Sequence, residues 1–316
     1  MATVLVTGAS GFVASYVIPA LLDAGHRVRA LVRNERGRQD VLRRLPEGRH
    51  GEVEFRFGDV TEPQGLAEAV AGADAVVHLV AIPRDFSAGR DLERINVGGT
   101  VNVIEAMKRG AVRRLIYLGN MGIANDPTLK FASSKARAEA AVAGSGLEWT
   151  ILKPSTMFGE RDGFFNIIAD LARRLPLVRF NPGIVPMPGL GRARFQPIWV
   201  GDVARVAALC LERPDTVGRS LELGGPRYWT YREIVEEVLR GMGARRLILP
   251  VPVPVIWLVA RIYETLKVYF PTATDQLRQL RLDNIGPLTL IRDEFGFEPR
   301  QLEGQLGYLK RKSSEQ

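Results

Sequence analysis

The residues best suited to chemistry lie near the start of the chain, where Thr7-Gly8-Ala9-Ser10-Gly11 follows a short apolar run. Gly8 permits a tight turn, and Gly11 lets the backbone approach a bound pyrophosphate closely. The helix expected next would offer N–H groups and a partial positive charge to that anion. Ala14 stands where a third glycine is usual, and alanine is the smallest alternative for close packing of helix on strand. This context predicts a dinucleotide-binding loop. Its predicted contact residues are Gly8, Ser10, Gly11, Phe12 and Val13.

An arginine at the end of the second expected strand bears on which dinucleotide is bound. NAD-specific sites place an acidic residue there for the ribose hydroxyls, whereas this chain has Leu31-Val32-Arg33-Asn34. A guanidinium matches a 2′-phosphate in charge and in hydrogen-bond geometry. We therefore predict NADP(H) in preference to NAD(H), the alternative being that Arg33 is only a solvated surface residue.

Two further strand ends carry residues suited to a cofactor. In Gly58-Asp59-Val60, the carboxylate of Asp59 is placed to accept a hydrogen bond from the adenine amino group. In His78-Leu79-Val80-Ala81, small residues at Val80 and Ala81 lie where the backbone must come close to the cofactor. His78 itself is expected to be a core histidine, because it belongs to an apolar strand.

Apolar strands and amphipathic helices alternate in the first half of the chain, and these elements must hold the residues named above. Such alternation predicts a doubly wound parallel sheet of the Rossmann type. The expected strands are 4–7, 28–32, 53–57, 75–79, 115–118 and 149–152, and the expected helices are 11–24, 36–45, 63–71, 96–109 and 133–143.

The alternation breaks at about Pro154, where proline and glycine become frequent and helical patterns follow. We predict a binding domain over residues 1–153, with sheet and helix additions from 195–225. Residues 154–316 would form a smaller, mainly helical substrate or lid region, with helices expected at 200–211, 231–242, 256–267, 273–282 and 302–310. A lid over the carboxyl ends of the strands would cover the usual ligand site of open α/β sheets.

The motifs together resemble those of the atypical and extended short-chain dehydrogenase/reductases, the NAD(P)-dependent epimerase/dehydratase-like proteins. Besides the stretches above, the resemblance rests on Asn96-Val97-Gly98-Gly99-Thr100, Leu152-Lys153-Pro154-Ser155 and Gln196-Pro197-Ile198-Trp199-Val200-Gly201-Asp202. It covers nearly the whole chain. Within the superfamily, Leu223-Gly224-Gly225-Pro226 and Thr230-Tyr231-Arg232-Glu233-Ile234 are similar to the group that contains the nucleotide-binding accessory subunit of mitochondrial complex I and its bacterial relatives.

The resemblance implies a catalytic tyrosine four residues before a lysine, together with a serine or threonine at the end of the preceding strand. This chain has Lys135, but Phe131 stands at the tyrosine position, and Asn120 and Met121 lie where a hydroxyl is expected. A phenylalanine has no proton to give. The resemblance also implies that Lys135 binds the nicotinamide ribose and that Pro154 and Ser155 lie beside the nicotinamide.

Two functions are compatible with this pattern. The first is an NADP(H)-binding structural or regulatory protein without turnover. The second is an NADPH-dependent oxidoreductase that acts on a hydrophobic carbonyl or quinone-type substrate with another proton donor. Candidate donors are Tyr117, Glu160, Arg161 and Asp162.

Composition limits the classes of partner. The chain has 316 residues, 46% of them hydrophobic, and a formal net charge of +8. Its arginines are spread along the sequence, which argues against nucleic acid as a partner. The single cysteine, Cys210, lies in an apolar run, and no metal-ligand spacing is present. Since Met1 leads directly into the first strand, a cytoplasmic protein is expected, with a location peripheral to a membrane left open.

The run 247–260 is strongly apolar and is flanked by Arg245, Arg246 and Arg261, and an aromatic and basic continuation extends the segment to residue 270. Its prolines and short length argue against a transmembrane segment, which needs about 20 apolar residues. It is a candidate docking surface for a protein, a membrane surface or a hydrophobic small molecule. The alternative is that it packs within the chain's own core.

Overall fold

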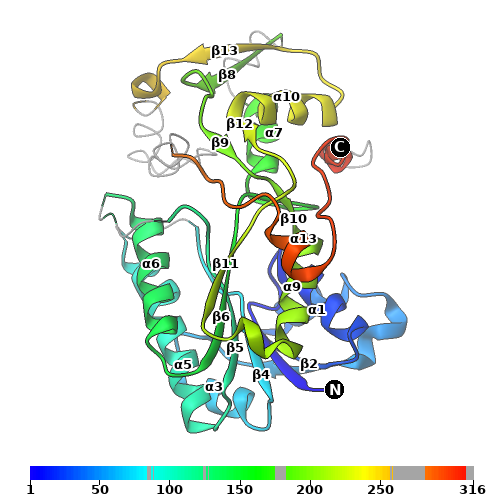
Figure 1. Cartoon of the computed structure of the whole chain (residues 1–316), viewed down its shortest axis with the longest axis vertical. Helices are drawn as coiled ribbons and strands as arrows, with labels where there is room; N and C mark the ends of the chain where they lie inside the picture. The colour runs from blue at the N-terminus through cyan, green and yellow to red at the C-terminus, as the bar shows by residue number, and fades with distance from the viewer. Residues whose placement is uncertain are drawn as a thin grey trace. The chain divides into compact units, whose positions relative to one another are not determined.

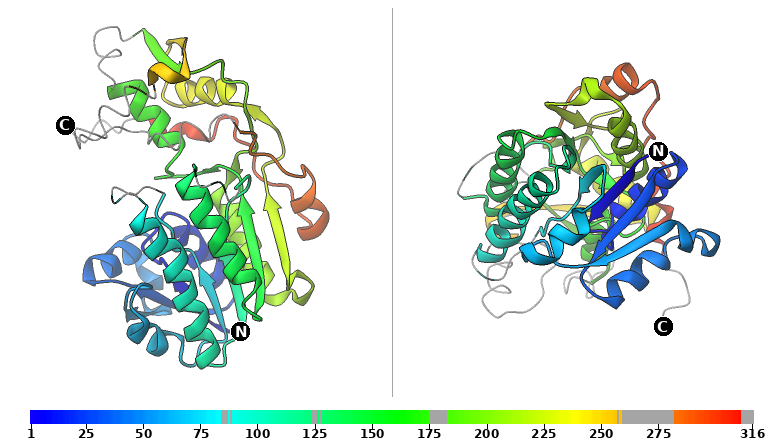
Figure 2. Two further views of the ribbon diagram at one scale, coloured as in Figure 1. Left: turned by 90° about the vertical axis from the view of Figure 1, so that its left-hand side faces the viewer. Right: turned by 90° about the horizontal axis from the view of Figure 1, so that it is seen from below.

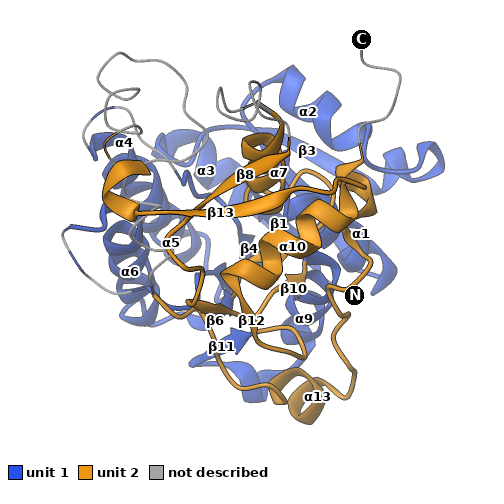
Figure 3. Cartoon of the chain, turned by 90° about the horizontal axis from the view of Figure 1, so that it is seen from above, with its two compact units in different colours: residues 1–154, 200–223 blue, residues 155–199, 224–316 orange. Residues whose placement is uncertain are grey.

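The computed structural model describes residues 1–83, 87, 89–123, 126, 128–174, 183–256, 258 and 282–310. The chain divides into two compact units (Figure 3). Residues 1–154 and 200–223 form the first unit, and residues 155–199 and 224–316 form the second. None of the helices in the described ranges has the length and hydropathy that a membrane span requires.

The first unit is built on a sheet of seven parallel strands (Figure 1). In spatial order they are β11 (Arg219–Leu223), β6 (Glu148–Pro154), β5 (Arg114–Leu118), β4 (Ala75–His78), β1 (Thr3–Thr7), β2 (Arg27–Val32) and β3 (Val53–Phe57). The central strands β1 and β4 are buried almost throughout, because both faces of the sheet are covered. The chain order reverses between β1 and β4, which is the point where folds of this type bind ligands. The predicted Rossmann-type fold is confirmed.

Helices cover both faces of this sheet. The helices α3 (Pro63–Val70), α5 (Gly99–Arg109) and α6 (Lys130–Ala143) lie side by side on one face (Figures 1 and 2). On the other face α1 (Ala14–Asp23) packs beside α9 (Val200–Glu212), and α2 (Glu35–Leu42) follows β2. The first helix begins at Ala14, later than predicted, because residues 8–13 form a series of turns.

The second unit combines helices with short strands that the sequence pattern did not predict. Its helices include α7 (Phe165–Arg174), α10 (Tyr231–Gly241) and α13 (Leu290–Phe295), and residues 253–256 are also helical. Three two-stranded sheets pair β7 (Met157–Phe158) with β10 (Ile198–Trp199), β8 (Ile184–Pro188) with β13 (Leu247–Val251), and β9 (Arg194–Phe195) with β12 (Trp229–Thr230). The predicted helix at 302–310 is instead a short 3-10 helix, Leu306–Leu309. The helices predicted at 256–267 and 273–282 lie outside the described residues, apart from positions 256, 258 and 282.

A buried glutamine ties together segments of the second unit that are distant in sequence. Gln196 is fully buried, its Nε2 donates to the carbonyl oxygen of Gly225 at 2.8 Å, and its Oε1 accepts from the N–H of Gly286 at 2.8 Å. A Cβ atom at Gly225 would collide with the carbonyl oxygen of Pro197, and one at Gly224 would collide with the Gln196 side chain. The close approach of the Pro197 backbone therefore requires glycine at position 225, and the buried Gln196 side chain occupies the space that a Cβ at position 224 would need.

Candidate functional site

The loop between β1 and α1 has the shape of a phosphate cradle. Gly8 has a φ of +71°, and a Cβ atom there would lie 3.2 Å from the backbone of Leu79 and Val80. The N–H of Gly11 donates to the carbonyl oxygen of Gly8 at 2.9 Å, which closes the turn. No side chain in the described part of the chain caps the amino-terminal end of α1, and the first turn of α1 holds no acidic residue. These features fit a pyrophosphate, because the positive end of the helix lies next to a run of small residues, Gly8-Ala9-Ser10-Gly11.

Arg44 supports this loop from behind, a role that the sequence analysis missed. Its guanidinium donates to the carbonyl oxygens of Ser10 and Gly11. These two bonds fix the orientation of the peptide groups to which the Ser10 and Gly11 carbonyls belong. The guanidinium also adds positive charge close to the loop. Arg44 follows α2 by two residues, and no sequence motif marks it.

Arg33 is exposed, and no other described residue forms a hydrogen bond or ion pair with its side chain. It precedes α2, which Asn34 caps by accepting a hydrogen bond from the N–H of Gly37 at 3.0 Å. A Cβ atom at Gly37 would lie 3.8 Å from the Oγ of Ser10, so the start of α2 lies next to the phosphate loop. Arg38, in contrast, is paired with Glu35 at 2.8 Å. The ends of β1 and β2 thus bring a free guanidinium and a serine hydroxyl to one edge of the sheet.

The residues predicted to lie near the adenine or the nicotinamide of the cofactor differ in solvent exposure and in the hydrogen bonds that they already make. The Oδ1 of Asp59 accepts hydrogen bonds from the N–H and the hydroxyl of Thr61, at 2.8 and 2.9 Å, so this oxygen holds a turn. Val60 is 5% exposed and packs so closely on α5 that a Cβ at Gly99 would lie 2.8 Å from its Cγ2. Val80 is half-buried and Ala81 is exposed.

His78 belongs to a chain of buried hydrogen bonds below the strand ends. The Thr100 hydroxyl donates to the carbonyl oxygen of Asn96 at 2.7 Å, so it accepts at 3.1 Å from the Nε2–H of His78. The Nδ1 of His78 then accepts from the Thr7 hydroxyl at 2.6 Å. Burial lowers the pKa of His78 to about 3 and keeps the ring neutral. The expectation of a core histidine agrees with these contacts.

Lys135, on α6, is 2% exposed and is held within the first unit. Its Nζ donates to the hydroxyl of Tyr117 at 2.8 Å and to the carbonyl oxygen of Leu118 at 2.6 Å. Burial lowers the pKa of Lys135 to about 7, although the nearby Glu139 carboxylate opposes this shift. Burial also raises the pKa of Tyr117, which is 1% exposed and therefore poorly suited to give a proton to a substrate. The third N–H of Lys135 is not used by these two bonds.

A carboxylate fills the space at the end of β5 where the resemblance implies a hydroxyl group. The Oε1 of Glu139 accepts a hydrogen bond from the N–H of Asn120 at 3.1 Å, and its Oε2 pairs with Lys153 at 3.0 Å. A Cβ atom at Gly119 would collide with this carboxylate. Glu139 thus explains the small residue at position 119. The sequence analysis did not identify Glu139 as part of the site.

Phe131 lies one turn before Lys135 and is half-buried. The Ser134 hydroxyl donates to its carbonyl oxygen at 2.8 Å and accepts from the Nδ2 of Asn96 at 3.0 Å. Asn96 lies in a π-helical turn, Glu93–Gly98, and its Oδ1 accepts from the N–H of Ile82 at 2.9 Å. One amide therefore joins the segment after β4 to α6, which fixes the backbone that follows Val80 and Ala81.

Pro154 and Ser155 fall in different units. The carbonyl oxygen of Pro154, the last residue of β6, accepts from the N–H of Met121 at 3.0 Å. The Ser155 hydroxyl donates to Asn284 and accepts from the N–H of Gln196 at 3.2 Å, so it stabilises the interior of the second unit.

Among the alternative proton donors, Asp162 is 3% exposed and caps α7, with its Oδ1 2.9 Å from the N–H of Phe164. Glu160 and Arg161 are exposed.

The buried ammonium group of Lys135 predicts a distinctive pH dependence of stability. A lysine in the unfolded chain keeps its proton up to a pKa of 10.5, whereas folded Lys135 loses it near pH 7. Between these values the unfolded state binds more protons, so the free energy of unfolding rises with pH. Lys135→Met should remove this rise, and Lys108→Met, on the exposed part of α5, should keep it. Thermal unfolding of the three proteins from pH 6 to pH 10 measures the effect, and parallel curves for the parent and Lys135→Met would contradict it.

Sequence comparison with known proteins agrees with a dinucleotide-binding site in the first unit. A family model described as NAD(P)H-binding matches residues 8–170. Subunit 9 of the alpha subcomplex of mitochondrial NADH dehydrogenase (ubiquinone) 1 from Arabidopsis thaliana is 28% identical over 90% of this chain and 69% of its own length. The photosystem II assembly factor Ycf39 of Guillardia theta is 23% identical over 98% of this chain and 93% of its own. The chloroplastic divinyl chlorophyllide a 8-vinyl-reductase of Zea mays is 27% identical over 86% of this chain and 67% of its own.

Solved structures share the fold at low sequence identity. A nucleoside-diphosphate-sugar epimerase from Staphylococcus aureus superposes with a TM-score of 0.74 at 18% identity, covering 96% of this chain and 99% of its own. A UDP-glucose 4-epimerase from Thermus thermophilus, solved in complex with NAD, gives 0.67 at 21% identity, with coverages of 97% and 98%. With its seven-stranded sheet and its glycine cradle, the chain belongs to the NAD(P)H-binding family, within the extended short-chain dehydrogenase/reductase superfamily.

Proposed function

We propose that this protein binds NADP(H), in preference to NAD(H), and serves as a cofactor-binding structural or regulatory protein. The loop of Gly8, Ser10, Gly11, Phe12 and Val13 would hold the pyrophosphate. The free guanidinium of Arg33 would bind the 2′-phosphate, with Ser10 beside it. Asp59 and Val60 would contact the adenine, and Val80 and Ala81 would line the path toward the nicotinamide.

The observation that carries the non-catalytic proposal is the environment of Lys135. Its ammonium group is bound by Tyr117 and by a backbone carbonyl in the core, while Phe131 occupies the position from which the family's tyrosine would donate. The remaining N–H of Lys135 would donate to a nicotinamide ribose hydroxyl, and we assign Lys135 to cofactor binding on that basis. Pro154 and Ser155 remain proposed neighbours of the nicotinamide. Removal of a general acid costs roughly two to four orders of magnitude in rate.

A second candidate function is NADPH-dependent reduction of a hydrophobic carbonyl or quinone-type substrate. The similarity to a vinyl-reductase of Zea mays favours it. Hydride transfer depends mainly on the proximity of cofactor and substrate, so water or the substrate itself would have to supply the proton.

We also propose a partner for the second unit. Some relatives are named as subunits of a mitochondrial NADH dehydrogenase. We infer that this chain likewise works beside a hydrophobic partner and that segment 247–270 contacts it; the described part of this segment is residues 247–256 and 258.

Titration with the two reduced cofactors tests the binding proposal. The nicotinamide fluorescence of NADPH should change on addition of purified protein, at lower protein concentrations than that of NADH. Failure of both to bind would reject the cofactor site, and tighter binding of NADH would reject the role of Arg33.

Phe131→Tyr tests whether the tyrosine alone is missing. We expect the variant to remain as inactive as the parent against a panel of carbonyl and quinone substrates, because Glu139 fills the space at Gly119 and no hydroxyl lies at the end of β5. Phe164→Tyr, directly before α7, serves as a control for adding a hydroxyl to a half-buried ring. Rapid NADPH oxidation by the parent protein would instead support the reductase.

A further inference from the structure

The small parallel sheet of β8 and β13 is apolar on both of its faces. Along a strand, alternate side chains point to opposite faces. Ile248, Val185 and Met187 are buried in the core of the second unit. The opposite face, here called the outer face, consists of Ile184, Pro186, Pro188, Leu247, Leu249 and Val251, which pair with one another across the two strands. Leu247 is 67% exposed and Leu249 is 41% exposed.

Exposed apolar side chains continue beyond both strands. Leu190, after β8, is 58% exposed, and Val255, after β13, is 51% exposed. The two segments are adjacent, because the N–H of Gly189 donates to the carbonyl oxygen of Val251 at 2.8 Å. Together with the outer face, these side chains make a contiguous apolar surface of a kind that marks interaction sites.

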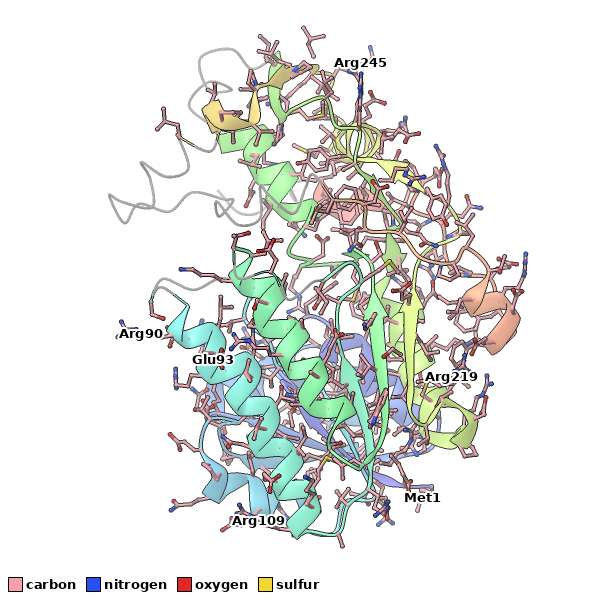
Figure 4. All side chains as sticks on the ribbon, turned by 60° about the vertical axis from the view of Figure 1, so that its left-hand side comes forward. Met1, Arg90, Glu93, Arg109, Arg219 and Arg245 are labelled. Carbon is pink, nitrogen blue, oxygen red and sulfur yellow. The ribbon has the colours of Figure 1, made fainter. Side chains whose placement is uncertain are left out.

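Arginines border this surface. A cavity of about 440 Å³ is lined by Arg232, Arg240, Arg245 and Arg246 and also by Leu247 of the outer face. Arg232 and Arg240 are paired with Glu236 and Glu237, and Arg246 donates to the carbonyl oxygen of Ala172. Arg245 is exposed, has no ion pair or hydrogen bond with any described residue, and points away from the ribbon in Figure 4. The positive charge next to the leucines is thus only partly neutralised.

The prolines of β8 and β13 bear on whether a protein strand or a membrane surface contacts this sheet. A protein that added a strand to this sheet would need free N–H groups along β8 or β13. Pro186, Pro188 and Pro250 lack that group, so neither strand offers a continuous edge. An apolar face next to arginines has the composition of surfaces that lie at the boundary of headgroups and acyl chains in anionic membranes.

We propose that the outer face docks on an anionic phospholipid bilayer, with Leu247 and Leu249 entering the acyl boundary and the arginines facing the headgroup phosphates. The inference gives a specific partner to the docking role proposed above, and it does not depend on cofactor binding.

Co-sedimentation with vesicles tests the inference. The full chain should bind vesicles of equal parts phosphatidylcholine and phosphatidylglycerol, should bind phosphatidylcholine alone much more weakly, and should dissociate as salt is added. Leu249→Ser should weaken binding about tenfold. Leu288→Ser should leave it unchanged, because Leu288 has the same 41% exposure in the same unit but lies off the sheet. Arg245→Ala should weaken binding about fivefold, since each basic residue near an anionic surface contributes about that factor.

Three outcomes would overturn the inference: absence of vesicle binding, equal binding to both vesicle types, or self-association that Leu249→Ser abolishes. A parallel NADPH titration of the same samples distinguishes rejection of the docking surface from rejection of the proposed cofactor site. If the vesicles are not bound but NADPH is, only the docking surface is rejected.

Discussion

Replacement of Arg33 by alanine is expected to weaken the binding of NADPH about 10- to 100-fold and to leave the binding of NADH nearly unchanged. A hydrogen bond to a charged group contributes roughly 1.5–3 kcal/mol, which corresponds to this range. Arg33 is exposed, and its replacement removes no hydrogen bond or ion pair with the described residues. Fluorescence titration of parent and variant with both cofactors measures the effect.

The same strand provides the control. Arg27 is exposed at the amino-terminal end of β2, whereas Arg33 follows its carboxyl-terminal end. Ligands bind at the carboxyl ends of parallel strands, so Arg27→Ala should change the affinity for neither cofactor. Equal losses for NADPH and NADH in Arg33→Ala would mean that the guanidinium does not recognise the 2′-phosphate.

The largest loss of stability is expected from Gly225→Ala. The added methyl group would collide with the carbonyl oxygen of Pro197, which is backbone and cannot turn aside as a side chain can. Relief of the collision would disturb the hydrogen bonds between Gln196 and Gly225. Overpacking of this kind costs about 3 kcal/mol or more, which should lower the midpoint of thermal unfolding by roughly 6–12 °C.

Gly163→Ala is the matched control for that measurement. Gly163 belongs to the same unit, is exposed, and has no atom within 4 Å of the position where its Cβ would lie. Its unfolding midpoint should stay close to that of the parent. Comparable midpoints for Gly225→Ala and the parent would show that the backbone near Pro197 can move at little cost.

The sequence alone predicted the sheet and the phosphate loop because both depend on local patterns. Strand 53–57 was located without error, since apolar residues bounded by turn signals indicate a strand wherever they occur. Gly8 was identified for the same reason, because a turn after a strand restricts the residue type directly. In the second unit, β9 and β12 were missed, since two residues are too few to show any periodicity.

The missed parts of the site depend on contacts between residues far apart in the chain. The bonds of Arg44 to Ser10 and of Glu139 to Asn120 join elements that no spacing rule connects. Tyr117 is a candidate proton donor because it lies next to the altered end of the predicted strand 115–118. Its burial and its bond with Lys135 depend on the packing of α6 against β5, which no local pattern reveals.

The Glu139 carboxylate has a consequence for mutational paths through this family. A serine at position 119 would force the Glu139 carboxylate to move from its bonds, and shortening Glu139 first would remove the acceptor that Lys153 and the N–H of Asn120 use. Each single step toward the hydroxyl-bearing strand end is therefore unfavourable, although the double change avoids the collision. Such reciprocal sign epistasis couples the two positions, so Gly119 and Glu139 are expected to change together rather than one at a time.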